Sequence, residues 1–175
     1  MEEIKFSKRE LLENYKTSNI GVQLVNNNVS ILFITDSKNI GLPENVIELY
    51  DFRKKPEIST KGIARCSLFS LLQQMVDDKS LNVNEETIVQ VCAPTPTDRN
   101  RGRLLKIYEQ IGFTQTNSNP NTPELKSSVR NLIETLEKQC EMTGGGEYIK
   151  TKSRKRRKTK INKKKGKQTR RKKRR

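Results

Sequence analysis

The residues with the clearest chemical potential form a turn at 56–64, directly before an apolar-striped helix expected over 65–78. The turn reads PEISTKGIA, with a glycine at position 62. A glycine at the first turn of a helix lets several backbone N–H groups point to one place, with the positive end of the helix dipole behind them. The pattern predicts a phosphate or pyrophosphate site. The alternative is an ordinary loop with a helix-starting glycine.

A second candidate site is the basic segment 150–175. It holds 18 of the chain's 36 Lys and Arg residues and none of its 20 acidic residues, so residues 1–149 carry a net charge of −2. With Ile161 as its only large apolar residue, this tail is expected to be disordered. It has no aromatic residue for base stacking, but its charges suit non-specific contact with nucleic-acid phosphates. A nuclear address and adhesion to anionic membranes are the alternatives. The predicted nucleic-acid-binding residues are Arg154, Lys155, Arg156, Arg157, Lys158, Lys163, Lys164, Lys165, Arg170, Arg171, Lys172, Lys173, Arg174 and Arg175.

Composition excludes several other kinds of site. The chain has no histidine, which removes Ser-His and Cys-His nucleophile pairs and any histidine base. Its three cysteines, Cys66, Cys92 and Cys140, lack CxxC spacing, which argues against zinc and favours buried, reduced thiols. The sequence has neither a long apolar run nor a signal-peptide pattern at its start. We therefore expect a soluble intracellular protein, nuclear or associated with nucleic acid through its tail.

The elements that must position the turn follow from apolar spacing and capping signals. A helix is expected from Ser7, whose capping box with Glu10 is joined by a Phe6–Leu11 staple, to about 15–19. Strands are expected at 21–25, 29–34 and 46–52, with positive-φ asparagines at 26–28 between the first two. The helix that follows the turn should bury Leu68, Leu71, Leu72, Met75 and Val76.

The second half of the chain alternates strand and helix. A strand is expected at 88–93 and a helix at about 99–111, followed by a short strand. The inward residues of that helix are Leu104, Leu105, Tyr108 and Ile111. A last helix is predicted from Thr122 as N-cap and Pro123 as its first residue, ending before 143. The order predicts an α/β (α+β) domain at 1–142 with a mixed sheet, a Gly-rich linker at 143–149 and the basic tail at 150–175.

This order, with these residues, resembles the GNAT acetyltransferase superfamily over residues 20–114. In that family a strand leads to a Pro-x-x-[Gln/Arg]-x-x-Gly-x-[Gly/Ala] turn, and a later helix ends Tyr-x-x-x-Gly-Phe. Pro56 and Gly62-Ile63-Ala64 match the first pattern, and Tyr108 with Gly112-Phe113 matches the second. The chain departs from the family at Ser59, where Gln or Arg is usual, and at Thr60, where Gly is common. The family's asparagine near the start of the second helix falls at Arg101.

The resemblance implies a minimal GNAT-like acyl-CoA N-acyltransferase fold, acetyl-CoA as cofactor and an amine as acceptor. It implies that Tyr108 gives a proton to the departing thiolate, or else only packs in the core. Glu48, with Asp51 as runner-up, lies on the strand that would line the cleft and is the candidate base. Arg53, Lys54 and Lys55 are candidates for contact with the cofactor's 3′-phosphate, or else form a solvated edge. The residues expected at the pyrophosphate are Ser59, Thr60, Lys61, Gly62, Ile63, Ala64 and Arg65.

Two functions from different classes remain open. One is an acetyl-CoA-dependent N-acetyltransferase that its tail tethers to nucleic acid, acting on a protein amine, a small amine or its own tail. The other is a catalytically inactive GNAT-like body that presents a polycation for nucleic-acid binding or packaging. The match at Gly62, Tyr108 and Phe113 favours the first, and the departure at Ser59 favours the second.

Overall fold

The computed structural model describes residues 7–92, 101–117 and 123–142, which include the turn and both halves of the family resemblance. The tail and its predicted binding residues lie outside the described residues, as does the 143–149 linker. The elements in chain order are α1 (Lys8–Leu11), β1 (Tyr15–Thr17), β2 (Gly21–Val25), β3 (Val29–Ile34), η1 (Ser37–Ile40), β4 (Val46–Lys54), α2 (Ile63–Asp77), η2 (Lys79–Leu81), β5 (Ile88–Cys92), α3 (Arg101–Gln110), β6 (Thr114–Gln115), β7 (Glu124–Ser128) and α4 (Val129–Met142).

The strands form one mixed sheet in the order β1-β2-β3-β4-β5-β7-β6. Strands β4 and β5 are parallel, with Val46 beside Ile88 and Glu48 beside Gln90, and the other neighbours are antiparallel. The paired residues end at Glu48, although β4 continues to Lys54. The predicted mixed sheet is confirmed, and its parallel pair lies across the strand–helix–strand unit from β4 to β5. It leaves the second half of β4 free of β5, next to the turn that opens α2.

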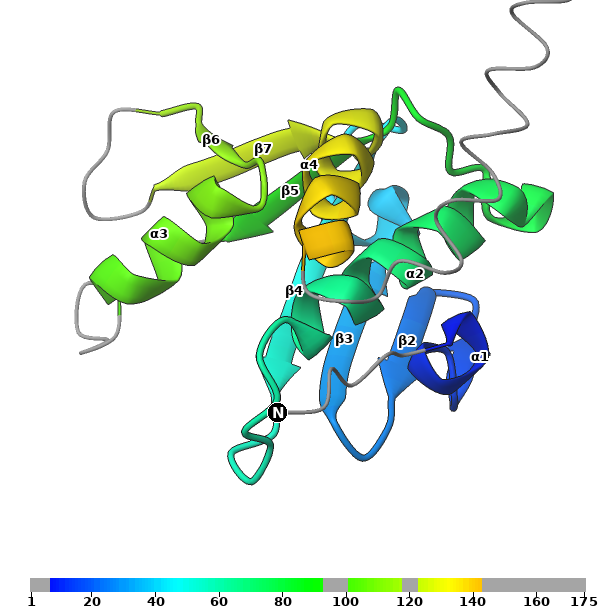
Figure 1. Cartoon of the computed structure of the whole chain (residues 1–175). Coiled ribbons are helices and arrows are strands. Elements are labelled where there is room, and N and C mark those ends of the chain that lie inside the picture. The colour runs from blue at the N-terminus through cyan, green and yellow to red at the C-terminus, as the bar shows by residue number, and fades with distance from the viewer. Residues whose placement is uncertain (1–6, 93–100, 118–122, 143–175) are drawn as a thin grey trace, which may run out of the picture.

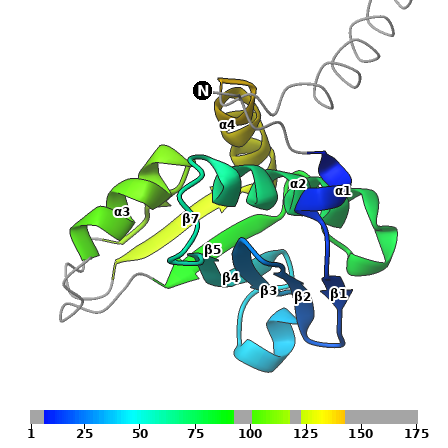
Figure 2. The same cartoon turned by 60° about the horizontal axis from the view of Figure 1, so that its bottom comes forward.

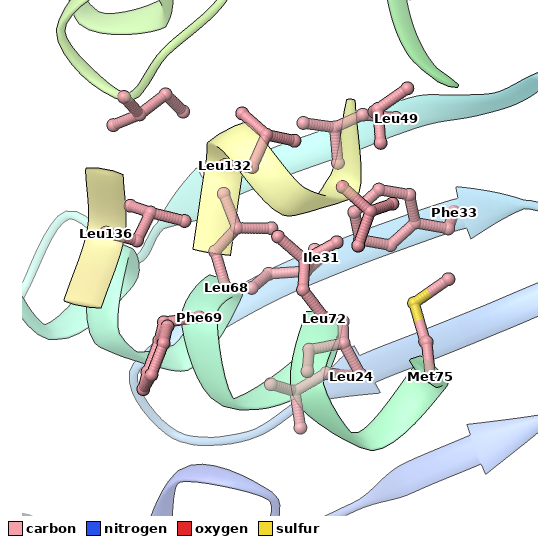
Figure 3. Close-up of a cluster of buried hydrophobic side chains, with 14 of the residues drawn as sticks. Leu24, Ile31, Phe33, Leu49, Leu68, Phe69, Leu72, Met75, Leu132 and Leu136 are labelled. Carbon is pink, nitrogen blue, oxygen red and sulfur yellow. The ribbon is translucent and has the colours of Figure 1, made fainter. Parts of the chain in front are cut away.

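Helices α1, α2 and α4 cover one face of the sheet, and α3 lies at the end of the sheet that β6 and β7 form (Figures 1 and 2). The hydrophobic core lies between the sheet and the helices on this face. There, side chains of the strands, α2 and α4 point toward one another (Figure 3). Leu68, Leu71, Leu72 and Met75 are buried as the apolar stripe predicted, and Val76 packs at the margin. Burying such side chains contributes roughly 1.5–3 kcal/mol each. Helix α2 thus packs against both the sheet and its neighbour α4.

The two predicted helix boundaries at the ends of the domain are wrong in part. The capping box of Ser7 and Glu10 is present, but α1 ends at Leu11 and β1 follows, where the prediction continued the helix. Phe6, the proposed staple partner, lies outside the described residues. Near the other end, 124–128 is strand β7, and α4 begins only at Val129. Pairing with β5 takes these residues out of the predicted helix, and Ser128, not Thr122, accepts from the Asn131 N–H.

Two local expectations are also corrected. None of the asparagines at 26–28 has a positive φ. Instead, Asn26 closes the β2–β3 hairpin by accepting from the N–H groups of Asn28 and Val29. The expectation of reduced thiols fails for two cysteines: Cys66 of α2 and Cys140 of α4 form a disulfide, with Cα atoms 5.6 Å apart. No described helix has the length and apolar content needed to span a bilayer.

Candidate functional site

A cavity of about 990 Å³ lies where β4 ends, α2 begins and α3 passes. Its lining comes from β3, from the stretch 52–65 that joins β4 to α2, and from α3. Strand β4 pairs with β5 only as far as Glu48, so its second half is free of β5 here. The described lining residues are Ser30, Phe52, Arg53, Lys54, Lys55, Pro56, Thr60, Lys61, Gly62, Ala64, Arg65, Arg103, Leu104, Ile107 and Tyr108. Both halves of the predicted chemistry, the glycine turn and Tyr108, therefore share one cavity.

The first turn of α2 faces this cavity with open backbone donors. Gly62 precedes the helix with φ +82°, a left-handed conformation that favours glycine. The first N–H bonded within the helix is that of Cys66, which donates to the Gly62 carbonyl at 3.0 Å. The N–H groups of Ile63, Ala64 and Arg65 thus lack a helical acceptor, and no described side chain caps them. This is the geometry that binds phosphate.

Six cationic side chains surround the cavity: Arg53, Lys54, Lys55, Lys61, Arg65 and Arg103. Arg53 is bidentate to the Asp51 carboxylate, with Nε 2.7 Å from Oδ1 and Nη2 3.0 Å from Oδ2. Among the described residues, Lys54, Lys55 and Lys61 have no acidic partner. The cavity therefore offers a large excess of positive charge to an anion with several phosphates.

The Arg65 side chain is hydrogen-bonded to residues of two other helices. Its Nη1 donates to Oε1 of Gln139 on α4 at 3.0 Å, and its Nη2 donates to Oε1 of Gln110 on α3 at 2.8 Å. Gln139 Nε2 in turn donates to the Gln110 carbonyl at 2.6 Å. Arg65 thus joins three helices next to the cavity, and a phosphate contact by its guanidinium would compete with these two bonds.

Tyr108 lies on the cavity side of α3, half-buried. Its hydroxyl has no hydrogen-bond partner among the described residues, whereas its ring packs against Phe113. Burial and, to a smaller extent, the Asp51 charge raise the pKa of the Tyr108 phenol above its usual value of 10.0. The phenol is therefore kept protonated at neutral pH and can donate a proton into the cavity.

Asp51 and Glu48 lie at different places relative to the site. The Asp51 carboxylate accepts from Ser30 Oγ at 2.7 Å and lies close enough to Tyr108 to affect its pKa. Glu48 stands between Ile34 of β3 and Gln90 of β5 and is not among the described residues that line the cavity. The role of Glu48 as base stays a prediction, and Asp51 is the carboxylate that the fold brings to Tyr108.

Most of the residues predicted to bind phosphate line the cavity, and two do not. Thr60, Lys61, Gly62, Ala64 and Arg65 line the cavity, whereas the Ile63 side chain is buried in the core and Ser59 is exposed outside the lining. Because the prediction for Ile63 and Ser59 concerns backbone N–H groups, these side-chain positions leave it open. Sequence reasoning missed Ser30 and Arg103. Neither belongs to a motif, and only the pairing of β3 with β4 and the position of α3 bring them to the site.

Comparisons with known proteins concern the fold. No protein-family model and no curated protein matches the sequence. A structure of the PaiA N-acetyltransferase from Thermoplasma acidophilum in complex with coenzyme A is similar, with 14% identity, a TM-score of 0.42 and coverage of 62% of this chain and 60% of that one. A CoA-dependent acyl-homoserine lactone synthase, MesI, is similar at 14% identity and a TM-score of 0.46, with coverage of 70% and 69%. The chain thus spans less than two thirds of the first of these proteins. The mixed sheet with its parallel β4–β5 pair, and α2 opening on Gly62, are features that the resemblance to the GNAT superfamily predicted.

Proposed function

We propose that this protein is an acyl-CoA-dependent N-acyltransferase that transfers acetyl from acetyl-CoA to an amine. The observation that carries the proposal is a single cavity lined by the open N-terminus of α2, six cations and the Tyr108 hydroxyl. Phosphate anchoring and proton donation are two of the three requirements of acyl transfer from a thioester, and residues suited to each line this cavity. Use of a CoA cofactor would agree with PaiA, which was solved with coenzyme A, and with MesI, which is named as CoA-dependent.

Each group has a defined task in this proposal. Acetyl-CoA supplies the thioester carbonyl that the amine attacks. The N–H groups of Ile63, Ala64 and Arg65 bind the pyrophosphate, and Lys54, Lys55 and Lys61 supply charge for the remaining phosphate. Tyr108 holds its proton at the hydroxyl and gives it to the leaving sulfur. Asp51, held by Ser30 and Arg53, accepts the amine proton directly or through water, with Glu48 as the alternative base.

Calorimetric titration of acetyl-CoA into the full chain tests the cofactor site. Gly62→Glu places a carboxylate at the proposed phosphate position and should abolish binding. Because any side chain at φ +82° is strained, Gly62→Ala serves as the matched control for strain without charge. A second control, Gln23→Glu, adds the same charge on an exposed position of β2 outside the cavity lining. Equal loss of binding in all three variants, or no binding by the native chain, would refute the proposal.

The second candidate function is nucleic-acid binding by the tail, and the observation that favours it is its 18 Lys and Arg residues without one acidic residue. If ~6–10 tail charges contact phosphates, affinity should fall ~10³- to 10⁵-fold between about 50 and 200 mM salt. Fluorescence anisotropy with a labelled oligonucleotide measures this slope for the full chain and for a chain without 150–175. Salt-insensitive binding, or binding that survives the deletion, would contradict a role for the tail. A chain that binds oligonucleotide but not acetyl-CoA would fit the inactive, packaging alternative.

A further inference from the structure

A disulfide fixes the C-terminal end of α4 next to the start of α2. Cys140, in the last turn of α4, is bonded to Cys66, the fourth residue of α2, and both side chains are buried. In Figure 1 the orange end of α4 lies over the start of α2. The helix that leads into the basic tail is therefore fixed beside the helix start that forms the proposed phosphate site.

The same end of α4 also contacts the helix that carries Tyr108. Gln139 accepts from Arg65 at the start of α2 and donates to the Gln110 carbonyl at the end of α3. Gln110 lies two positions after Tyr108. The last turn of α4 thus bridges the two segments that supply the phosphate site and the proton donor.

This anchoring fixes the point at which the chain leaves α4, close to the start of α2. The eight residues 143–150 that follow α4, up to the first tail lysine, Lys150, could span up to about 29 Å when extended. A short tether of this kind gives an effective concentration of about millimolar for groups that can reach the site. Lysines of the tail therefore meet the cavity at a concentration that a separate acceptor protein rarely attains.

We infer that the acceptor amines are lysine side chains of the chain's own tail, residues 150–175, and that the protein acetylates itself in cis. This inference rests on the proposed acetyl-CoA-dependent function. Its structural basis is the placement of the last turn of α4 by Cys66–Cys140 and by Gln139 against Arg65 and Gln110.

The charges at the site set an order of events. Six described cations line the cavity and repel a polycation, so tail lysines enter only after cofactor phosphates have neutralised part of that charge. An amine must lose its proton before it can attack, and a lysine surrounded by other cations does so more readily than an isolated one. The clustered lysines of the tail are suited to this step, whereas its arginines are not.

The step balances without any additional reactant. The lysine nitrogen forms a bond to the acetyl carbonyl carbon, and the carbon–sulfur bond of the thioester breaks. The amine proton goes to a carboxylate or to water, and the Tyr108 proton goes to the leaving sulfur. Each turnover removes one positive charge from the tail. The slope of log affinity for a nucleic acid against log salt concentration should therefore become shallower by about 0.9 for each modified lysine that contacts a phosphate.

The test follows the intact mass of the full chain over time with acetyl-CoA, and then maps the modified residues by peptide mass. We expect whole acetyl units to accumulate at tail lysines in the native chain. Tyr108→Phe and Gly62→Glu measure spontaneous acetylation by the cofactor. Equal rates in these variants and the native chain would overturn the inference.

Dilution separates reaction in cis from reaction between molecules. The rate per molecule should not change on serial dilution with the cofactor saturating. A Tyr108→Phe chain mixed with the native chain should keep an unmodified tail, although it offers the same lysines. A rate that falls in proportion to dilution, with acetyl groups appearing on the Tyr108→Phe chain, would overturn the inference of reaction in cis.

A last comparison keeps this inference distinct from the proposed function. A variant with every tail lysine changed to arginine retains the charge but has no acceptor amines in the tail. It should bind acetyl-CoA in calorimetry like the native chain and gain no acetyl groups in the tail region. If the native chain binds acetyl-CoA and acetylates an added small amine but not its tail, the self-acetylation is refuted and the proposed function stands. Absence of acetyl-CoA binding would refute both.

Discussion

The rings of Tyr108 and Phe113 meet edge to face at the C-terminal end of α3, with centroids 5.7 Å apart and planes at 80°. Between them the chain closes a Schellman motif: the Phe113 N–H donates to the Tyr108 carbonyl at 3.0 Å, and the Gly112 N–H donates to the Glu109 carbonyl at 3.1 Å. The ring contact is the hydrophobic pair that accompanies this cap. The Tyr-x-x-x-Gly-Phe pattern is thus explained by helix termination, except for the Tyr108 hydroxyl.

The hydroxyl and the cap can be separated by substitution. Tyr108→Phe keeps the ring contact, so the free energy of unfolding should change little, while turnover should fall ~10²-fold or more if the hydroxyl is the proton donor. Release of free CoA thiol measures turnover, and calorimetry should show unchanged acetyl-CoA affinity. Phe113→Ala, at a buried position, should do the reverse and lower the free energy of unfolding by about 3–5 kcal/mol. Unchanged turnover in Tyr108→Phe would make Tyr108 a packing residue only.

Alanine substitution of Gly112 and of Gly102, near the two ends of α3, should change the free energy of unfolding in opposite directions. Gly112 has φ +109°, and a Cβ there would lie 3.1 Å from Asn131 Nδ2 and from Thr135 Oγ1 on α4. Gly112→Ala should lower the free energy of unfolding by about 1–3 kcal/mol, because it adds backbone strain and crowds α4. Gly102 lies inside α3 with open space around it, so Gly102→Ala should raise the free energy of unfolding by up to about 1 kcal/mol. Chemical denaturation compares them, and similar effects from both would contradict the Schellman assignment.

Local signals in the sequence predicted the parts of the fold that depend on nearby residues. The apolar spacing of α2, the Ser7–Glu10 capping box and the turn at Gly62 each act within a few residues, and all are present. Residues 124–136 show why other parts failed. Leu125, Val129, Leu132 and Leu136 fit a helical face, yet the alternation from Leu125 to Ser128 also fits a strand. Antiparallel pairing with β5, more than 30 residues earlier, decides the outcome.

In the candidate site, too, local motifs could be predicted and long-range placement could not. The glycine turn and Tyr108 were predicted from their motifs, but the position of Asp51 depends on an irregularity in β4. Simple alternation would put Asp51 on the core face with Leu49. A register shift opposite Leu32 and Phe33 pairs Asp51 with Leu32 instead, and Phe52 takes the place toward the core beside Ile31. No residue pattern marks this shift, so the sequence alone could not place Asp51 next to Tyr108. Glu48 was therefore the first candidate for the base.

The disulfide between Cys66 and Cys140 is the structural feature that most directly contradicts the sequence analysis. It closes a loop with a sequence separation of 74 residues, so its reduction should lower the free energy of unfolding by about 2–4 kcal/mol. Guanidinium denaturation with and without dithiothreitol measures this difference. A Cys66→Ala/Cys140→Ala variant is the control and should not respond to the reductant. Alkylation of the denatured native chain should find one thiol, Cys92, before reduction and three afterwards. Three thiols in both cases would show that the bond does not form.

The effect of Asp51 on Tyr108 predicts a pH dependence of known sign. Burial and the Asp51 carboxylate raise the Tyr108 pKa in the folded protein above about 10, the value for an exposed phenol. A donor must be protonated, so kcat should fall only as the pH rises through this raised pKa. The same shift adds to the free energy of unfolding below about pH 10, and this contribution is lost as the pH rises through the folded pKa.

Asp51→Asn tests the electrostatic part of this shift. Removing the negative charge stabilises the phenolate, so the pKa of Tyr108 should fall. Because the variant also lacks the proposed base, kcat should drop, and the alkaline limb of the remaining activity should move to lower pH. The difference in tyrosinate absorbance between each chain and its Tyr108→Phe counterpart should move in the same direction. Asp78→Asn is the matched control, because Asp78 raises the pKa of Tyr15 and not that of Tyr108. It should leave the alkaline limb in place. If the tyrosinate difference moves in Asp51→Asn but the alkaline limb does not, a group other than Tyr108 sets the limb, and Tyr108 loses its assignment as the proton donor.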